Sequence, residues 1–319
     1  MATLTCGPRQ IRYQLDGPAD GPAYVLVNGL TQYIKVWESF RDALVAKGYR
    51  VATFDLLGQG ESDKPSLFIE QDDQVAVLRD IVAELGQRPV FLAGISFGGV
   101  IALRYAIAHG DTIAGLVPMS AFAELTPQLF LLGNAMRTGL ILGGTNYLQD
   151  LLFPMNLSDA YLSERLDKLE NAKRKAWLIN DLYALQNLME SFLDFAPLTA
   201  QLSSIRVPTM ILNGEFDFLT PRKLHESLRA HIPDSALVII PRVYHAFTIE
   251  KPVLAADLLA RFATDVLAGR WQGKGRVLIA PEEAGGEIIP FPVGYDHLRA
   301  LPLSPPMPGA AKDREAPPS

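Results

Sequence analysis

A short stretch around residue 95 constrains the fold of this chain more than any other. Residues 90–95 are apolar or glycine, as in a strand buried inside a sheet, and Gly94-Ile95-Ser96-Phe97-Gly98 follows the pattern G-x-S-x-G. An apolar run with the composition of a buried helix follows from Val100. A serine on the sharp turn between such a strand and helix is placed as a nucleophile. We expect glycine at 94 and 98 because a side chain at either position would crowd this strained turn.

Short apolar runs alternate with helical patterns on both sides of this turn. Besides residues 90–95, we expect strands at residues 10–15, 23–27, 50–54, 113–117, 209–212 and 237–240. Apolar side chains at helical spacing predict helices over 37–45, 74–85, 100–109 and 253–267. This alternation predicts an α/β fold with a mostly parallel sheet that has helices on both faces.

Two segments depart from this alternation. Residues 122–196 show helical spacing without a convincing strand, so we interpret them as a helical cap over the carboxyl edge of the sheet. The core would then comprise residues 1–121 and 197–270. Residues 271–319 form a C-terminal extension with two short apolar runs that could strap onto the core, and we expect its proline-rich end to be disordered.

The composition limits which binding partners and which cellular compartment we expect. The 319 residues carry a net charge of -6 and no long basic block, which argues against a nucleic-acid partner. Cys6 is the single cysteine, so a disulfide or thiolate metal site within the chain is excluded. No signal peptide or membrane-spanning segment is evident. We expect a cytoplasmic protein without a metal or cofactor.

A serine nucleophile needs a base, and the usual chain order on such a scaffold is serine, acid, histidine. Of five histidines, only His245 follows a late predicted strand and precedes the last strong helix. His109 ends the helix after the serine, His297 lies in the tail, and we expect His225 and His231 on a surface helix.

The acid is expected just after the strand at 209–212. Asp217 is the preferred candidate there, and Glu215, two residues closer to the strand, stays open as an alternative. Either carboxylate would fix the imidazole tautomer and stabilise the imidazolium that forms.

Two backbone N–H groups are expected to stabilise the oxyanion. One belongs to Phe97, directly after the nucleophile, and the other to Leu30 in the loop after the strand at 23–27. Gly29 allows that loop to turn over the pocket. Asn28 adds a side-chain donor or holds the loop in place, and we favour the second role.

Four motifs in this order resemble the α/β-hydrolase superfamily over about residues 10–270. They are the loop at 54–62, the serine turn at 95–99, the acid loop at 214–221 and the histidine loop at 244–245. The resemblance implies Ser96, Asp217 and His245 as a catalytic triad, with Leu30 and Phe97 as oxyanion donors. It also implies that Asp55 is a structural loop anchor.

Two departures from the superfamily pattern bear on the substrate. Asn28-Gly29 stands where many members have His-Gly, and Tyr244 precedes the histidine where glycine is common. Asn-Gly also occurs in the hydroxyacyl transferases that make the lipid precursor of rhamnolipids. The chain is similar to them in three short stretches, residues 26–29, 72–75 and 213–214.

The cap sequence is rich in large apolar side chains, which suggests an acyl chain or another apolar ester as substrate. The residues that we expect to contact substrate are Asn28, Gly29, Met136, Leu140, Phe153 and Tyr244. The resulting hypothesis is a serine hydrolase of a carboxylic ester or lactone with an apolar acyl part.

Alternatives remain at this stage. One is an acyltransferase that joins hydroxyacyl chains and takes them from an acyl-carrier protein or a CoA thioester, with Lys173, Arg174 and Lys175 as a basic contact. Another is a non-catalytic ligand-binding protein. Carbon–carbon bond hydrolysis and perhydrolysis use the same triad and stay open, whereas covalent haloalkane cleavage would need a carboxylate in place of Ser96.

Overall fold

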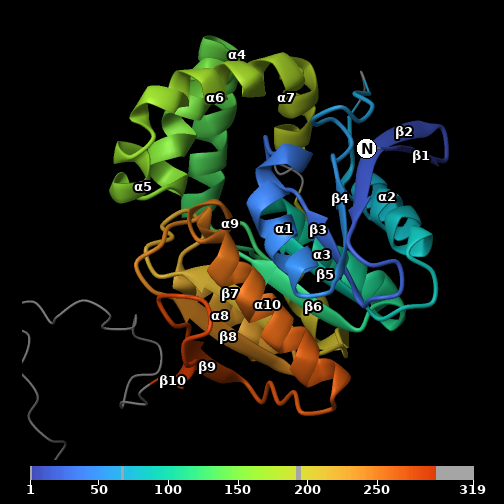
Figure 1. Ribbon diagram of the computed structural model, residues 1–319. Helices are drawn as coiled ribbons and strands as arrows, with labels where there is room; N and C mark the ends of the chain where they lie inside the picture. The colour runs from blue at the N-terminus through green and yellow to red at the C-terminus, as the bar shows by residue number, and fades with distance from the viewer. Residues whose placement is uncertain (1, 66–67, 192–194, 292–319) are drawn as a thin grey trace, which may run out of the picture.

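One ten-stranded sheet forms the centre of the protein (Figure 1). The computed structural model describes residues 2–65, 68–191 and 195–291. The strands are β1 (Ala2–Cys6), β2 (Arg9–Asp16), β3 (Ala23–Val27), β4 (Arg50–Phe54), β5 (Val90–Ile95), β6 (Gly115–Met119), β7 (Thr209–Gly214), β8 (Ser235–Ile240), β9 (Arg276–Ile279) and β10 (Ile289–Pro290). Their order across the sheet is β1-β2-β4-β3-β5-β6-β7-β8-β9-β10. All neighbours from β4 to β9 pair in parallel, and β1, β2 and β10 pair antiparallel at the two ends.

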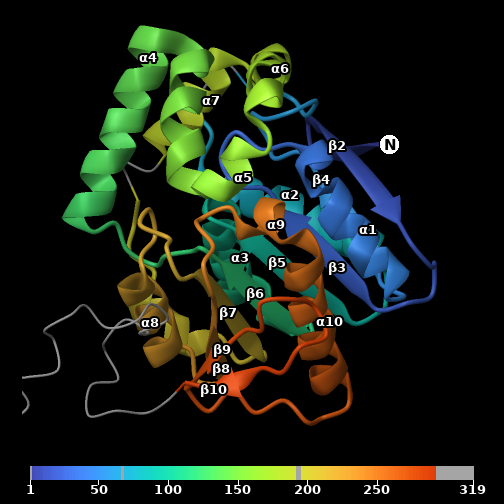
Figure 2. The same ribbon diagram turned by 60° about the vertical axis from the view of Figure 1, so that its left-hand side comes forward.

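Helices cover both faces of this sheet. The helices of the described residues are η1 (Ile34–Trp37), α1 (Glu38–Ala46), α2 (Gln71–Glu84), α3 (Phe97–His109), η2 (Gly110–Thr112), α4 (Pro127–Asn156), α5 (Asp159–Ser163), α6 (Leu166–Ile179), α7 (Leu182–Glu190), η3 (Thr199–Ser204), α8 (Arg222–His231), α9 (Phe247–Glu250) and α10 (Pro252–Leu267). α1 and α10 pack on one face, and α2, α3 and α8 pack on the other (Figures 1 and 2). The predicted mostly parallel sheet with helices on both faces is confirmed.

The central strands read as continuous apolar runs because each of their faces is buried. In β5, Phe91 and Ala93 belong to the hydrophobic cluster under α1 and α10, whereas Leu92 belongs to the cluster under α2, α3 and α8. This double burial fixes the register of β5 and with it the place where the strand delivers Ser96.

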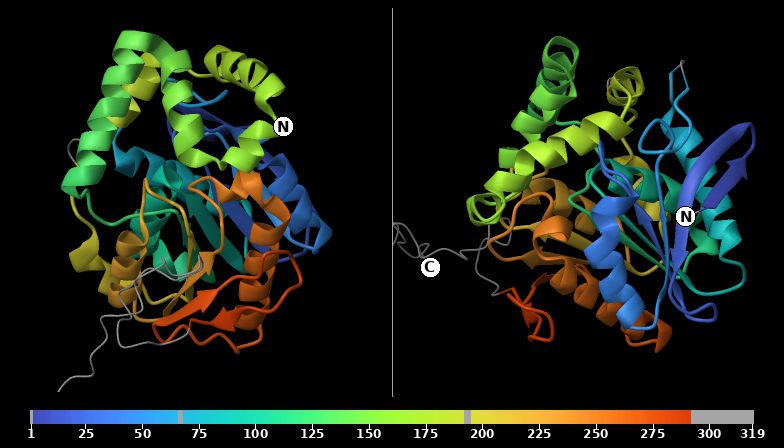
Figure 3. Two further views of the ribbon diagram at one scale, coloured as in Figure 1. Left: turned by 90° about the vertical axis from the view of Figure 1, so that its left-hand side faces the viewer. Right: turned by 45° about the horizontal axis from the view of Figure 1, so that its top comes forward.

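The helices α4 to α7 stand above the carboxyl edge of the sheet (Figures 1 and 3). α4 consists of two helical halves, because Gly144 has a φ of 70° and a ψ of -172° and reverses the chain. The halves lie against each other, since a Cβ at Gly139 would meet the Leu151 side chain at 3.2 Å. The described residues between 122 and 196 form helices and no strand. The boundaries of the cap stay a prediction.

Both ends of the sheet hold more strand than the sequence indicates. β1 was not expected. The two short apolar runs of the C-terminal extension pack onto the core as expected, and they do so as β9 and β10, which continue the sheet beyond β8 (Figure 3). The expected disordered end, 301–319, lies outside the described residues, as does His297. None of the described helices is long and apolar enough to cross a bilayer.

Candidate active site

Ser96 lies on the turn between β5 and α3. Its φ of 54° and ψ of -117° fall in a region that residues other than glycine rarely occupy. A Cβ at Gly94 would lie 2.2 Å from the Gly98 carbonyl oxygen, and a Cβ at Gly98 would lie 2.3 Å from that of Val27. Both positions therefore require glycine, for the steric reason that the sequence suggests.

The carboxyl ends of β7 and β8 bring an acid and a histidine together. His245 Nδ1 lies 2.9 Å from Asp217 Oδ2 and 3.1 Å from Oδ1. The Asp217 side chain is fully buried (0 % exposed). Glu215, the alternative acid, instead accepts the Arg242 backbone N–H at 2.9 Å. Of the two candidate acids, Asp217 is the one in contact with the histidine.

The electrostatics of this pair keep Asp217 ionised. Burial alone would raise the pKa of its carboxyl, but the attraction of His245, the hydrogen bond from its ring and the more distant His225 together lower that pKa below the ordinary 3.8. Because the carboxylate can only accept, His245 Nδ1 carries the hydrogen that it donates to Asp217. The opposite ring nitrogen, Nε2, is left to act as a base.

Two hydroxyl side chains that the sequence analysis did not single out contact Asp217 and His245. Thr220 Oγ1 lies 2.8 Å from Asp217 Oδ2, and the Thr220 backbone N–H donates to Oδ1 at 2.9 Å. Ser120, after β6, donates its hydroxyl to the His245 backbone carbonyl at 2.9 Å. Their places in the acid loop and at the carboxyl edge of the sheet are the signals that could have identified them.

His225 does not lie on a helix surface, contrary to the sequence prediction. α8 buries it completely (0 % exposed), whereas His231 on the same helix is exposed. Burial lowers the pKa of His225 from 6.5 to about 4, and within the described part of the chain its Nε2 has no hydrogen-bond partner. α8 is amphipathic, and the prediction failed because its buried stripe includes this polar residue.

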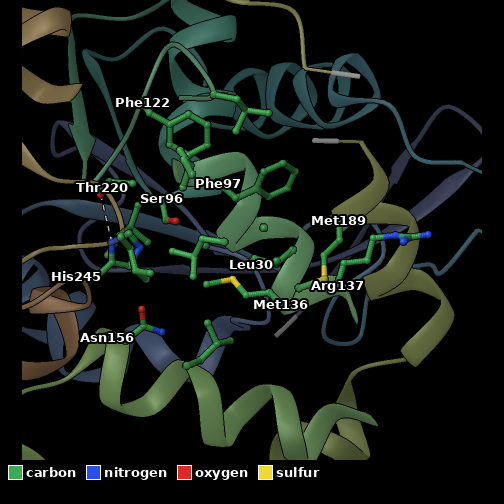
Figure 4. Close-up of a pocket in the computed structure, with 18 of the residues that line it drawn as sticks. Leu30, Ser96, Phe97, Phe122, Met136, Arg137, Asn156, Met189, Thr220 and His245 are labelled. Carbon is green, nitrogen blue, oxygen red and sulfur yellow. Dashed lines mark hydrogen bonds between the residues drawn. The ribbon is translucent and has the colours of Figure 1, made fainter. Parts of the chain in front are cut away.

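Ser96 and His245 line one pocket, together with Leu30 and Phe97 (Figure 4). Phe97 is the first residue of α3, so its N–H lies at a helix N-terminus, where negative charge is favoured. Among the hydrogen bonds of the described residues, none joins the Ser96 hydroxyl to the His245 ring. Such bonds are commonly loose in free enzymes and tighten when substrate binds.

Apolar side chains make up most of the remaining pocket wall. Phe122, Leu125 and residues of the cap, Leu129, Met136 and Met189, surround a cavity of about 130 Å³. Of the predicted contact residues, Gly29 and Met136 line this pocket.

The other four predicted contact residues lie outside the pocket wall. Asn28 donates from its side chain to the Phe54 carbonyl and accepts from the Trp37 indole, so it holds the loop, which is the role favoured from the sequence. Leu140 is fully buried in the hydrophobic core. Tyr244 stacks edge-on against Phe216, and Phe153 lies on the half of α4 beyond Gly144 without reaching the pocket. The sequence spacing did not reveal that the chain reverses at Gly144. Because of this reversal, the α4 side chains that face Ser96 differ from those that a single continuous helix would present.

Asn180 joins the cap to two loops of the core. Its Nδ2 donates to the Thr31 carbonyl at 3.2 Å, and its Oδ1 accepts the Gly60 N–H at 3.3 Å. Asp55, beneath these loops, accepts the backbone N–H groups of Ile34 and Glu61 at 2.8 Å each. Asp55 is therefore a loop anchor, as the resemblance implies.

Comparison with known proteins places this arrangement in a family. A family model described as serine aminopeptidase, S33, matches residues 22–252. The chain belongs to this family, within the α/β-hydrolase superfamily.

Two curated relatives and one solved structure show the extent of the likeness. The AB hydrolase superfamily protein YisY of Bacillus subtilis is 26% identical over 257 residues, which is 76% of this chain and 92% of the relative. The pimeloyl-[acyl-carrier protein] methyl ester esterase of Vibrio atlanticus is 26% identical over 250 residues, 75% of this chain and 94% of the relative. The crystal structure of MGS-M2, an α/β-hydrolase from a Medee basin deep-sea metagenome library, has a TM-score of 0.75 at 26% identity and covers 82% of this chain and 97% of that one.

Proposed function

We propose that this α/β-hydrolase cleaves a carboxylic ester or lactone with a small apolar acyl part, through an acyl-enzyme on Ser96. The observation that carries the proposal is the buried hydrogen bond between Asp217 and His245, at the wall of the apolar pocket that contains Ser96. A buried carboxylate that orients an imidazole next to a serine is the arrangement that activates a hydroxyl as a nucleophile.

In the proposed reaction, Ser96 Oγ attacks the ester carbonyl while His245 Nε2 takes the hydroxyl proton. The carbonyl oxygen becomes an oxyanion, which the backbone N–H groups of Leu30 and Phe97 stabilise. His245 then gives the proton to the departing alcohol oxygen, and the acyl group stays on Ser96. Water then attacks the acyl carbonyl and gives a proton to His245; the bond to Ser96 Oγ breaks as His245 returns the proton to that oxygen, and the acid leaves.

The size of the cavity points to short acyl groups. An apolar cavity of about 150 Å³ holds a benzene ring, so the cavity of about 130 Å³ beside Ser96 accommodates an acyl chain of roughly four to six carbons. Residues 122–196 would act as the cap that closes over this chain, because Met136 of α4 and Met189 of α7 both line the pocket.

The relative named as a methyl ester esterase supports ester cleavage, whereas acyl transfer uses the same residues and differs in what accepts the acyl group. In the basic cluster proposed for an acyl-carrier partner, Lys173 is bound to Asp150 at 2.8 Å and to Glu170 at 2.6 Å. Because this cation is already paired, the cluster gives transfer less support than the pocket gives hydrolysis.

A panel of acyl esters of graded length tests the proposal. We expect the highest kcat/KM at about four to six acyl carbons and a mass increase of one acyl group on the protein, located at Ser96. Products that always contain an added hydroxy acid or alcohol in place of free acid would favour the transferase. Binding of esters without any turnover or labelling would favour a non-catalytic binding protein.

A further inference from the structure

Asn156, the last residue of α4, presents an unpaired amide oxygen to the pocket. The residue lines the pocket wall, and Figure 4 shows its side chain directed inward on the side of His245. Its Oδ1 is buried, and within the described residues it has no hydrogen-bond partner. Of the buried side-chain atoms without a partner in that part of the chain, this oxygen is the one in the pocket wall.

The backbone around Asn156 is tied to the histidine loop. The Asn156 carbonyl accepts the N–H of Ala246, the residue after His245, at 2.9 Å. Two residues further on, Ser158 donates its N–H and its hydroxyl to Glu250, at 3.1 and 2.5 Å. Glu250 also accepts the Tyr244 N–H at 3.4 Å, so it links the end of α4 to the residue before His245. These bonds hold the backbone at Asn156 in a constant position relative to the loop that bears His245.

Several other polar side chains in the pocket wall already have partners. Gln32 Oε1 accepts the Gly29 N–H at 2.8 Å, the Thr220 hydroxyl is bound to Asp217, and Arg137 donates to Glu190 at 2.7 Å. A buried hydrogen-bond acceptor without a partner destabilises the folded protein, because it has lost its bonds to water. A bound ligand or water that donates a hydrogen bond removes this free-energy penalty. Asn156 is therefore a place where a substrate donor gains a specific interaction.

The layout of the pocket indicates which part of the substrate reaches Asn156. In Figure 4, His245 and Asn156 lie on one side of Ser96, and Met136 and Met189 lie on the opposite side. The departing oxygen must lie at His245 because it receives the proton there. The apolar acyl part then lies toward the methionines, and the alcohol part lies beside Asn156.

We propose that Asn156 Oδ1 accepts a hydrogen bond from a hydroxyl group on the alcohol part of the substrate. This inference rests on the proposed ester hydrolysis and narrows its substrate class to esters of an alcohol that carries a further hydroxyl. Asn156 is then a specificity-determining residue rather than part of the proton transfer.

Two esters of nearly equal shape test it: 2-hydroxyethyl butanoate and propyl butanoate, which differ by a hydroxyl in place of a methyl group. The wild-type protein should hydrolyse the hydroxyl ester with a kcat/KM at least about tenfold higher, as expected for one buried hydrogen bond. Asn156→Leu, which keeps the number and branching of the side-chain heavy atoms, should bring this ratio to about one. Asn171→Leu is the control, since Asn171 is an exposed amide of α6 outside the pocket wall, and it should keep the wild-type ratio.

The outcomes separate this inference from the function on which it rests. Wild-type protein that hydrolyses both esters equally well would overturn the role of Asn156 and leave ester hydrolysis standing, whether or not the variant folds. An equal loss of kcat/KM on both esters in Asn156→Leu would limit the amide to a general structural role in the pocket and also overturn the role. No hydrolysis of either ester, together with no acyl group on Ser96, would refute the proposed function itself.

Discussion

Asn180, at the end of α6, hydrogen-bonds to the carbonyl of Thr31, the residue that follows Leu30. Thr31 has a φ of 67°, a conformation that a residue other than glycine keeps only when its surroundings hold it. The cap therefore helps to fix the loop from which the Leu30 N–H is proposed to stabilise the oxyanion.

We expect Asn180→Ala to lower kcat about tenfold and to leave KM less affected. Without Asn180 the Leu30 N–H would move, and its hydrogen bond to the oxyanion would weaken mainly in the transition state rather than in the bound substrate. Steady-state kinetics on the preferred ester measure this. Asn171→Ala, at an exposed asparagine of the same helix, is the control. A variant with unchanged kcat and a lower unfolding free energy would limit Asn180 to a structural role.

Replacing Ser96 by alanine should lower turnover by at least about four orders of magnitude, because the nucleophile is removed while the oxyanion donors and the pocket remain. Labelling by a fluorophosphonate probe, followed by intact mass, should disappear in parallel. Circular dichroism should show that the variant is folded. Labelling that persists at another serine would mean that the nucleophile lies elsewhere.

The two candidate acids predict opposite results. Asp217→Asn should lower kcat by about 10⁴-fold, because an amide opposite His245 Nδ1 favours the wrong imidazole tautomer. Glu215→Gln should retain most of the activity, since Glu215 is bound to the Arg242 backbone rather than to the histidine. Near-normal activity in the first variant and a large loss in the second would transfer the role to Glu215.

His225 should make the fold sensitive to mild acid. Its pKa is lowered to about 4 in the folded protein from an ordinary 6.5, so the unfolded chain binds the extra proton between these values and stability falls as the pH drops. Between pH 7 and pH 5 this amounts to about 2 kcal/mol of unfolding free energy.

Denaturant unfolding at the two pH values measures this effect. The His225→Gln variant should lose about 2 kcal/mol less than the wild type on acidification, whereas His231→Gln, at the exposed histidine of α8, should behave like the wild type. An unchanged pH dependence in the first variant would show that other groups cause the acid sensitivity.

The parts of the site that depend on local pattern were predictable from the sequence. Ser96, Asp217 and His245 each follow a buried parallel strand, and the apolar runs that mark such strands are visible in the sequence. Because β5, β7 and β8 are parallel strands of one sheet, their carboxyl ends lie at the same edge. The contact between Asp217 and His245 follows from that geometry.

The parts that depend on distant contacts were not predictable. β1 is mostly exposed and exists through its pairing with β2, so its residues carry no strong strand pattern. Asn180 contacts Thr31 across 149 positions, and the place of Asn156 depends on the reversal at Gly144. A single asparagine gives no sign in the sequence of whether its amide faces water, a loop or a substrate.

The pairing of β9 with β8 has a consequence for any shortened form of this protein. β8 leads into the loop that bears His245, and β9 covers its outer row of backbone hydrogen-bonding groups. A chain cut after Gly269 would leave that apolar strand as a bare edge, which invites strand addition by a second molecule. By pairing with β8, the residues of β9 thus protect the protein from edge-to-edge aggregation.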